Sequence, residues 1–275
     1  MRQKHLKRLT LGVLCTLTLL VLASCGNKNS EDSVKRIQNK NTLVLGTSAD
    51  DAPFEFPIVQ NGKKKIIGYD IMVGQKIADD LGVKLKVENI AFPSLLTELQ
   101  DKKVDLVLAG MVKTPAREKA VSFSKPYHQA ANVLLVRKED AHKYNHVSDL
   151  NGKSIGAQQS SAQEKIAKTQ LPKASLVTES SRGTLTAELK SQKVDGVLLG
   201  KDGAEIYTLK YPNQYAIAQV KLKTTADISA VSIGVNKDDK ALLKRINKKI
   251  TELKHSGELD KMFKQAQAQQ AKYGK

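Results

Sequence analysis

A helix–turn–strand segment that occurs twice in the chain constrains the fold more than any other feature. Residues 97–110 read T-E-L-Q-D-K-K-V-D-L-V-L-A-G, and residues 187–200 read A-E-L-K-S-Q-K-V-D-G-V-L-L-G. Each copy predicts an amphipathic helix, a turn, and a short strand that is buried on both faces and ends in Gly. Ligands of open α/β sheets bind outside the carboxyl ends of strands. Two such ends therefore indicate two similar lobes that face one cleft.

The first copy continues into a pattern that is typical of carboxylate binding. Gly110 follows the strand, and the chain then reads M-V-K-T-P-A-R. Thr114 is the expected N-cap of a helix, with Pro115 at its first position. Arg117 then falls beside the free N–H groups of that helix, and a guanidinium can donate to both oxygens of a carboxylate. The alternative is an ordinary strand–helix unit in which Arg117 is only a surface charge.

The N-terminus has the pattern of an export signal. Four cations and no acid precede an apolar run over residues 9–22, which is too short for a comfortable membrane span. The run ends in V-L-A-S-C-G, which resembles the lipobox of bacterial lipoproteins. This resemblance implies a signal peptide over residues 1–24 and a lipid anchor on Cys25. We expect residues 25–41 to form a flexible tether on the extracytoplasmic face of the cell membrane.

Cysteine and charge usage exclude several classes of protein. Cys15 leaves with the signal, so only Cys25 remains, which excludes an internal disulfide, thiol catalysis and a cysteine metal site. Most of the 45 cationic side chains stay in the mature chain and outnumber the 28 acids, but they are scattered lysines, which argues against a nucleic-acid partner. His142 and His146 lack a third metal ligand, and no G-x-S-x-G elbow occurs. We expect no metal, no cofactor and no enzymatic activity.

The rest of the chain alternates between strand and helix patterns, which predicts a parallel-rich α/β architecture. Residues 69–81 are the expected helix before Gly82, and a long helical tail from Asp238 is broken at Gly257. Five motifs together resemble the polar amino-acid solute-binding proteins of bacterial ABC importers. They are G-T-S-A-D-D-A-P-F-E-F (46–56), I-G-Y-D-I (67–71), V-D-L-V-L-A-G-M-V-K-T-P-A-R (104–117), V-S-F-S-K-P-Y (121–127) and L-N-G-K-S-I-G (150–156).

The resemblance spans nearly all of residues 42–265 and implies the two-lobe type II periplasmic-binding-protein fold, with a hinge between the lobes. Lobe 1 would comprise residues 42–130 and 227–275, and lobe 2 would comprise residues 131–226. The hinge would lie near residues 129–132 and 225–228. A small amino acid would be captured by hinge closure. The implied partners are an ABC permease and its ATPase subunits.

The resemblance also assigns roles to residues of the cleft. Arg117 would clamp the α-carboxylate of the ligand. The backbone of Ala109, Gly110 and Met111 would add hydrogen-bond donors, together with the helix N-terminus at Ser161. Phe92 would pack on the ligand side chain.

Three departures from the family pattern concern the ligand's ammonium group and its surroundings. The family usually has an Asp at the end of the second-lobe strand, where this chain has Gly200, and a Tyr in the first loop, where it has Asp51. The family usually has a hydroxyl residue after A-G-M, where this chain has Val112. Burial of an unpaired ammonium would cost several kcal/mol. Either Asp202, Glu205 or Asp51 therefore supplies the negative charge, or the ligand lacks an ordinary α-ammonium.

The first loop also carries Asp50 and Glu55. With Asp51, these acids either face a cationic ligand side chain, which favours arginine or lysine, or are solvated loop residues. We expect Phe54 and Phe56 to fill the core of the lobe, and Arg182 to be an exposed residue at a helix start.

The sequence favours an extracytoplasmic amino-acid receptor of an ABC importer. Two alternatives remain: a sensor or adhesin lipoprotein that acts without a permease, and a lyase-like or dehydratase-like enzyme on the same fold.

Overall fold

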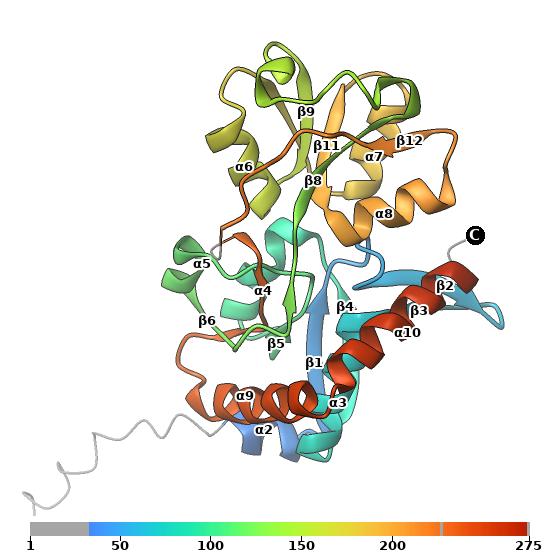
Figure 1. Cartoon of the computed structure of the whole chain (residues 1–275). Coiled ribbons are helices and arrows are strands. Elements are labelled where there is room, and N and C mark those ends of the chain that lie inside the picture. Colours follow the sequence, from blue (N-terminus) through green and yellow to red (C-terminus); the bar gives the residue numbers. More distant parts are fainter. Residues whose placement is uncertain (1–32, 226–227, 274–275) are drawn as a thin grey trace, which may run out of the picture.

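The structure, a computed structural model, describes residues 33–225 and 228–273. The chain has an α/β fold with two lobes, one above the other in Figure 1. The predicted signal peptide (1–24) and Cys25 lie outside the described residues.

Lobe 1 is built on a five-stranded sheet with the order β4-β1-β5-β14-β6. Strands β4 and β5 run parallel to β1, whereas β14 is antiparallel to β5 and β6. The elements of this lobe are α2 (Ser33–Asn39), β1 (Thr42–Thr47), β2 (Phe56–Gln60), β3 (Lys63–Ile67), α3 (Tyr69–Leu81), β4 (Lys84–Asn89), η2 (Phe92–Ser94), α4 (Leu95–Gln100), β5 (Leu106–Val107), α5 (Pro115–Ala120), β6 (Val121–Phe123), β14 (Gly234–Asn236), α9 (Lys240–His255) and α10 (Glu258–Tyr273).

Lobe 2 is built on a second five-stranded sheet with the order β10-β9-β11-β8-β12. Strands β10 and β11 run parallel to β9, and β8 is antiparallel to both β11 and β12. The elements of this lobe are β8 (Asn132–Arg137), η3 (Lys138–Asp140), η4 (Val147–Leu150), β9 (Ser154–Gln158), α6 (Ala162–Gln170), β10 (Ser175–Glu179), α7 (Arg182–Lys190), β11 (Gly196–Gly200), α8 (Lys201–Lys210) and β12 (Tyr215–Ile217).

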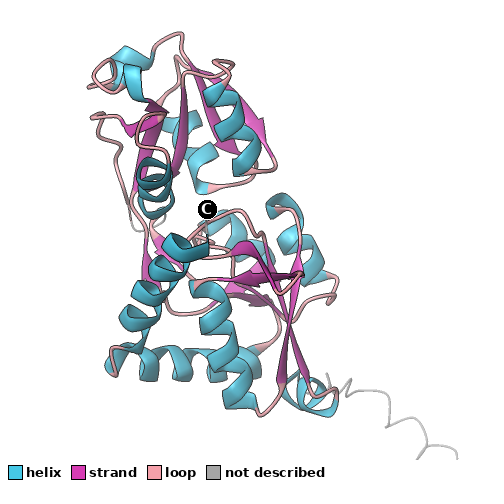
Figure 2. Ribbon diagram, turned by 90° about the vertical axis from the view of Figure 1, so that its right-hand side faces the viewer, coloured by secondary structure: helices cyan, strands magenta, loops and turns pink. Residues whose placement is uncertain are grey.

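Helices cover both faces of each sheet (Figure 2). Because successive side chains of a strand point to opposite faces, the apolar runs feed two different core clusters. In β11, Leu198 belongs to the cluster that contains Ile166 of α6, whereas Leu199 belongs to the cluster that contains Leu185 of α7. The strand pattern buried on both faces, predicted for residues 105–109, is correct in burial, but only Leu106–Val107 is a strand.

Two chain crossings connect the lobes. The short strands β7 (His128–Gln129) and β13 (Ala230–Val231) pair antiparallel beside them. The first predicted hinge segment overlaps β7 and the start of β8, and the second lies partly outside the described residues, since 226–227 are not described. Asn132 joins the crossings, because its Nδ2 donates to the carbonyl of Ile228 at 3.2 Å and its Oδ1 accepts from Gln163 Nε2 at 2.8 Å.

The predicted tether is wrong for its last part. Residues from Ser33 onward form the helix α2, in which Ile37 is fully buried and Arg36 pairs with Asp105 at 2.5 Å. Burial of one isoleucine and one ion pair binds this helix to lobe 1. The described residues from Ser33 onward are therefore not part of a tether.

The predicted helix boundaries at glycine are correct. Helix α3 ends at Gly82, which has φ of 71°, and Gly257 separates α9 from α10 with φ of 70°. Within the described ranges, no helix combines the length and the apolar character needed to cross a membrane.

Candidate functional site

A small cavity of about 20 Å³ lies between the lobes. The loops that follow the carboxyl ends of β1 and β5 reach it from lobe 1, and those that follow β9, β10 and β11 reach it from lobe 2. The cavity is lined by Asp51, Phe54, Phe92, Gly110, Val112, Arg117, Ala130, Ala162, Gln163, Arg182, Gly200 and Asp202. The structure thus brings together six of the predicted site residues. Ala109 and Met111 instead belong to the core of lobe 1, and Ser161 does not line the cavity.

Arg117 is positioned by the helix start that the sequence predicted. The hydroxyl of Thr114 accepts from the backbone N–H of Arg117 at 3.3 Å, and Pro115 is the first helical residue. The guanidinium donates to the carbonyl of Val112 and, across the cleft, to the carbonyl of Ser160 at 2.7 Å. Burial lowers its pKa to about 10. Among the described residues no carboxylate pairs with this cation, so it has capacity for an anionic partner.

Helix α6 faces Arg117 from lobe 2. Its N-cap is Ser161, whose hydroxyl accepts from the backbone N–H of Glu164 at 3.1 Å. The next two residues, Ala162 and Gln163, line the cavity at the first turn of the helix. Helix N-termini present free N–H groups and the positive end of the helix dipole. Arg117 and this helix start together form a site with positive potential.

Gly110 is constrained by a hydrogen bond, by its backbone conformation and by close packing. Its N–H donates to Asp70 Oδ2 at 2.8 Å, and its φ is 54°. A Cβ at this position would lie 2.8 Å from Asp51 Oδ2. The N–H of Gly110 therefore already has an acceptor within lobe 1, and its donation to a ligand stays a prediction. Asp70 is in the first turn of α3, and its Oδ1 also accepts from the Tyr127 hydroxyl at 2.8 Å.

Gly200 and Asp202 lie at the start of α8. Gly200 is the N-cap with φ of −61°, and nothing lies within 4 Å of a Cβ built on it. Asp202 lines the cavity, and its Oδ2 is 3.0 Å from His128 Nε2. Glu205 pairs with Lys201 and does not line the cavity. Of the acids on α8, only Asp202 therefore reaches the cleft.

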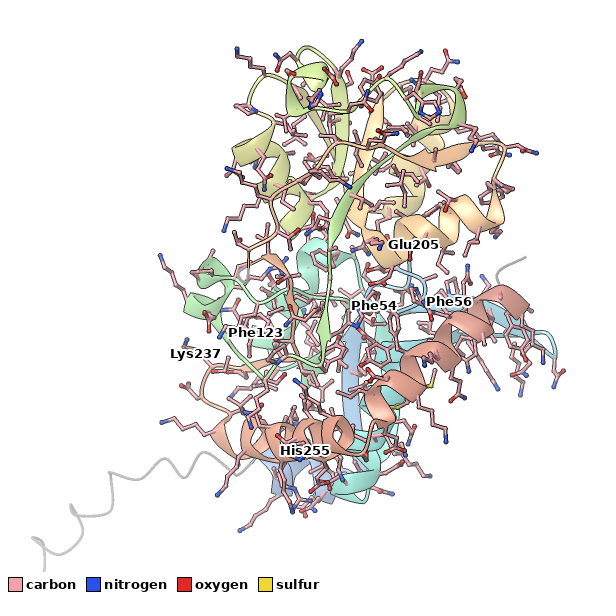
Figure 3. The ribbon with its side chains drawn as sticks, viewed as in Figure 1. Phe54, Phe56, Phe123, Glu205, Lys237 and His255 are labelled. Atoms are coloured by element: carbon pink, nitrogen blue, oxygen red, sulfur yellow. The ribbon has the colours of Figure 1, made fainter. Side chains whose placement is uncertain are left out.

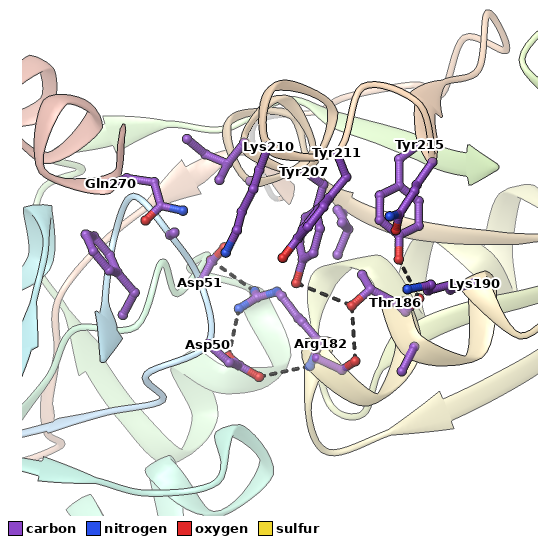
Figure 4. Close-up of a pocket in the computed structure, with 18 of the residues that line it drawn as sticks. Asp50, Asp51, Arg182, Thr186, Lys190, Tyr207, Lys210, Tyr211, Tyr215 and Gln270 are labelled. Carbon is purple, nitrogen blue, oxygen red and sulfur yellow. Dashed lines mark hydrogen bonds and ion pairs between the residues drawn. The ribbon is translucent and has the colours of Figure 1, made fainter. Parts of the chain in front are cut away.

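Arg182 is not the exposed residue that the sequence indicated. Its side chain is 7% exposed, and its guanidinium pairs across the cleft with Asp50 at 3.3 Å and Asp51 at 3.1 Å. The backbone N–H of Arg182 also donates to Asp50 Oδ2 at 2.9 Å (Figure 4). Burial alone would lower the pKa of Arg182, but Asp51 and Asp50 raise it above its ordinary value. Two acids of lobe 1 and one cation of lobe 2 thus join the lobes.

One positional signal could have identified Arg182. Strand β10 ends at Glu179, and the following residues S-S-R begin helix α7. This is the same strand–turn–helix arrangement that identified Arg117. Arg182 begins α7 at the carboxyl edge of its sheet, where cleft residues are expected.

The guanidiniums of Arg117 and Arg182 both lie over the aromatic ring of Phe92. The Cζ atoms of Arg117 and Arg182 are 5.4 Å and 5.9 Å from its ring centroid. Phe54 is buried in the lobe core as predicted, but it also lines the cavity. Phe56 is buried as well, and Figure 3 labels both phenylalanines at the boundary between the lobes.

The lobe 1 side of the cleft holds a group of buried carboxyls. Burial raises the pKa of Asp51 from 3.8 to about 6, although Arg182 acts in the opposite direction. Burial also raises the pKa of Glu55 well above 4.5, and Asp70 and Asp51 add to this shift. The pKa of Asp70 is raised by burial too. The three loop acids are not solvated, since Glu55 is fully buried and the side chains of Asp50 and Asp51 are only 20% and 12% exposed.

His128 is satisfied by Asp202, and its ring stacks on Phe263 with centroids 4.5 Å apart. No group of three or more His, Cys, Asp or Glu side chains that could hold a metal ion occurs in the part of the chain that the structure describes.

Comparison with known proteins gives a consistent set of relatives. The family described as bacterial extracellular solute-binding proteins, family 3, matches residues 43–267. The chain is 32% identical over 261 residues to the arginine-binding extracellular protein ArtP of Bacillus subtilis. The aligned region covers 94% of this chain and 97% of that protein.

Two solved structures are also similar. One is an amino acid ABC transporter substrate-binding protein from Streptococcus pneumoniae bound to L-arginine, with a TM-score of 0.82, 36% identity, and coverage of 86% of this chain and 98% of that chain. The other is the ancestral amino-acid-binding protein AncCDT-1, a precursor of cyclohexadienyl dehydratase. It has a TM-score of 0.73, 28% identity, and coverage of 85% and 98%.

Proposed function

Since this chain belongs to the bacterial extracellular solute-binding proteins of family 3, we propose that it is an amino-acid receptor of an ABC importer whose ligand is a basic amino acid, in the first place arginine. One observation carries this proposal. The cavity between the lobes is lined both by a guanidinium without a carboxylate partner among the described residues, Arg117, and by the acid Asp51, beside which Asp50 pairs with Arg182. A basic amino acid has the opposite charges at its two ends.

The carboxylate end of the proposed site consists of Arg117 and the first turn of α6. The guanidinium would donate to the α-carboxylate, and the N–H groups of Ala162 and Gln163 would complete its hydrogen bonds. The contact of Arg117 with the Ser160 carbonyl, at 2.7 Å, supports this assignment because it places the cation directly beside that helix start.

We assign the α-ammonium to Asp202. It is the acid of α8 that lines the cavity, two residues after the position where the family pattern has its Asp. We expect Asp202→Asn to weaken arginine binding by about 2 kcal/mol, because a buried ammonium would lose its charged partner. Glu205→Gln on the same helix is the matched control, since Glu205 is outside the cavity. Equal effects of the two variants would refute the assignment.

The side-chain end of the proposed site consists of Asp50, Asp51 and the ring of Phe92. A guanidinium pairs well with carboxylates and also stacks on an aromatic face, which an ammonium does less well. The relatives named above as arginine-binding or arginine-bound support the same ligand class.

The lobes of the proposed receptor are residues 42–130 with 227–275, and residues 131–226, with closure about the two crossings. Arg182 of lobe 2 meets Asp50 and Asp51 of lobe 1 across the cleft, which supports closure as the capture step. The receptor would then deliver the amino acid to a permease whose ATPase subunits drive transport. In contrast to the lyase-like and dehydratase-like alternative, we propose that it performs no chemistry of its own, which the substrate-binding relatives named above support.

We further propose that Cys25 is lipidated and holds the receptor on the outer face of the cell membrane. The V-L-A-S-C-G sequence and the two-chain anchor that it implies support this. Cys25→Ala should release the protein into the soluble fraction. Retention that still requires detergent would contradict lipidation.

The carboxylate assignment is tested by calorimetric titration of Arg117→Ala with arginine. We expect a loss of at least about 2 kcal/mol of binding free energy, because a buried, charged hydrogen-bond donor disappears. Arg245→Ala is the control, since Arg245 pairs with Asp80 on the outside of lobe 1. Unchanged affinity of Arg117→Ala would refute the proposed carboxylate site.

A further inference from the structure

Arg182 extends from lobe 2 into the acidic end of the cleft. It is the first residue of α7, and its guanidinium lies between Asp50 and Asp51, which belong to the loop after β1. The same guanidinium lies 5.9 Å from the Phe92 ring centroid. Figure 4 shows it enclosed by the two carboxylates on one side and by Thr186 and Tyr207 on the other.

These neighbours are the ones that a basic ligand would require for its own side chain. A ligand guanidinium needs carboxylates for its hydrogen bonds and an aromatic face for stacking. In this protein an arginine of the chain itself holds that position. Arg182 and Arg117 line the same cavity, so the position is continuous with the proposed carboxylate end.

We propose that Arg182 is an intramolecular competitor for the cationic side chain of the ligand, and that it thereby determines specificity. The ligand's guanidinium enters the corner formed by Asp50, Asp51 and Phe92 and displaces the guanidinium of Arg182. This inference rests on the proposed function, because it assumes that an amino acid is captured in this cavity.

The space around Arg182 requires and permits such an exchange. The cavity on its ligand side measures about 20 Å³, close to the volume that one water needs, so a second guanidinium fits only when Arg182 withdraws. On its other side lies a larger cavity of about 490 Å³, which is lined by Thr186, Tyr207 and Tyr211 among others. The unbranched side chain can rotate into this space, where tyrosine rings offer new faces for stacking. Its backbone N–H bond to Asp50 does not depend on the side chain.

The exchange explains how the site would discriminate by charge. A cationic ligand replaces one cation by another, so Asp50 and Asp51 keep a partner. A neutral ligand of the same shape would leave two partly buried carboxylates without a cation, which is strongly unfavourable. Arg182 therefore lowers the absolute affinity for arginine, because only the fraction of molecules with a withdrawn side chain can bind. It also keeps neutral ligands out of the corner.

The test compares arginine with citrulline, its neutral isostere, by calorimetric titration of wild type, Arg182→Met and Arg182→Lys. Methionine keeps an unbranched apolar stem but no charge. We expect Arg182→Met to bind arginine at least about tenfold more tightly than wild type, and citrulline to gain as well, because neither ligand then has to displace a guanidinium from the corner. Arg182→Lys retains a competing cation and should stay within about threefold of wild type for arginine.

Unchanged or weaker arginine binding by Arg182→Met would overturn the proposal, as would wild type that binds citrulline as tightly as arginine. A wild-type protein that binds neither ligand nor any other amino acid would instead refute the proposed function itself. A second measurement needs no variant in the binding assay. In ¹⁵N-labelled wild type, the Nε–H signal of Arg182 is identified by its loss in Arg182→Lys. When unlabelled arginine is added, the chemical shift of this signal should change, because the guanidinium leaves Asp50 and Asp51. A signal that stays in place would also overturn the proposal.

Discussion

The two copies of the helix–turn–strand segment are alike where they begin and different where they end. Asp105 Oδ2 accepts from the backbone N–H of Val44 at 2.9 Å, and Asp195 Oδ2 accepts from that of Ser154 at 2.8 Å. Val44 lies in β1 and Ser154 in β9, the strand that has the corresponding place in each sheet. The Asp of the repeated Val-Asp sequence thus makes the same hydrogen bond to the neighbouring strand in both lobes.

The closing glycines do not share a role. Gly110 has a positive φ, donates its N–H to Asp70, and has no room for a Cβ beside Asp51. Gly200 has φ of −61°, caps helix α8, and has free space where a Cβ would be. The sheet framework therefore constrains the start of each segment, whereas the backbone and the packing differ at its end. In lobe 1 the end is closely packed, and in lobe 2 it is open to the cleft.

The largest effect is expected where the two copies are alike. Asp105 has a side chain that is 4% exposed and also pairs with Arg36, whereas the Asp195 side chain is 32% exposed. Asp105→Ala should lower the free energy of unfolding by about 3 kcal/mol, since the partly buried cation Arg36 and a backbone N–H lose their acceptor. Asp195→Ala should cost about 1 kcal/mol. Denaturant titration measures both, and a larger loss at Asp195 would contradict the comparison.

A smaller effect should separate the two glycines. Gly110→Ala places a Cβ at positive φ and against Asp51, so we expect it to lower the free energy of unfolding by about 2 kcal/mol. Gly200→Ala should stay within about 0.5 kcal/mol of wild type, because the position is open and its backbone is ordinary. The same denaturant titration tests this pair. Equal costs would show that the two strand ends are not different after all.

The smallest effect concerns pH and sharpens the contrast between the two sides of the cleft. Because burial raises the pKa of Glu55 well above 4.5, this group binds a proton in the folded protein that the unfolded chain releases. Its contribution to stability is complete below pH 4.5 and is lost as pH rises through the folded-state pKa. Glu55→Gln should therefore flatten the fall of the free energy of unfolding at rising pH.

The control for this pH profile is Glu205→Gln on the lobe 2 side, where the carboxylate is exposed and pairs with Lys201. Asp51 and Asp70 act in the same direction as Glu55, so some slope should remain in Glu55→Gln. A profile identical to that of wild type would mean that Glu55 does not titrate as its burial requires.

Much of the framework was predictable from the sequence because local signals agreed with it. Thr114, Pro115 and Arg117 form the predicted helix start, and Gly82 and Gly257 end helices at the predicted places. The duplicated segment correctly indicated two sheets whose strand ends face one cleft. Each of these inferences depends on a few neighbouring residues.

What could not be predicted depends on contacts between distant segments. Arg182 is polar and begins a helix, so its local sequence indicates exposure, but Asp50 and Asp51 from the other lobe hold it in the cleft. The N–H of Gly110 was expected to serve a ligand, but Asp70 of α3 accepts it. The polar sequence before β1 indicated a tether, but Arg36 forms an ion pair with Asp105 and Ile37 is buried in the core of lobe 1. In each case the partner is far away along the chain.

The central claim is that the cleft between the lobes binds a basic amino acid, with Arg117 at its carboxylate and the Asp50–Asp51 corner at its side chain. The most direct test is calorimetric titration of the mature protein with each standard amino acid, after unfolding and refolding to remove any ligand that was carried through purification. We expect saturable one-to-one binding that is tightest for arginine. No binding across the set, or tighter binding of a neutral or acidic amino acid, would contradict the account.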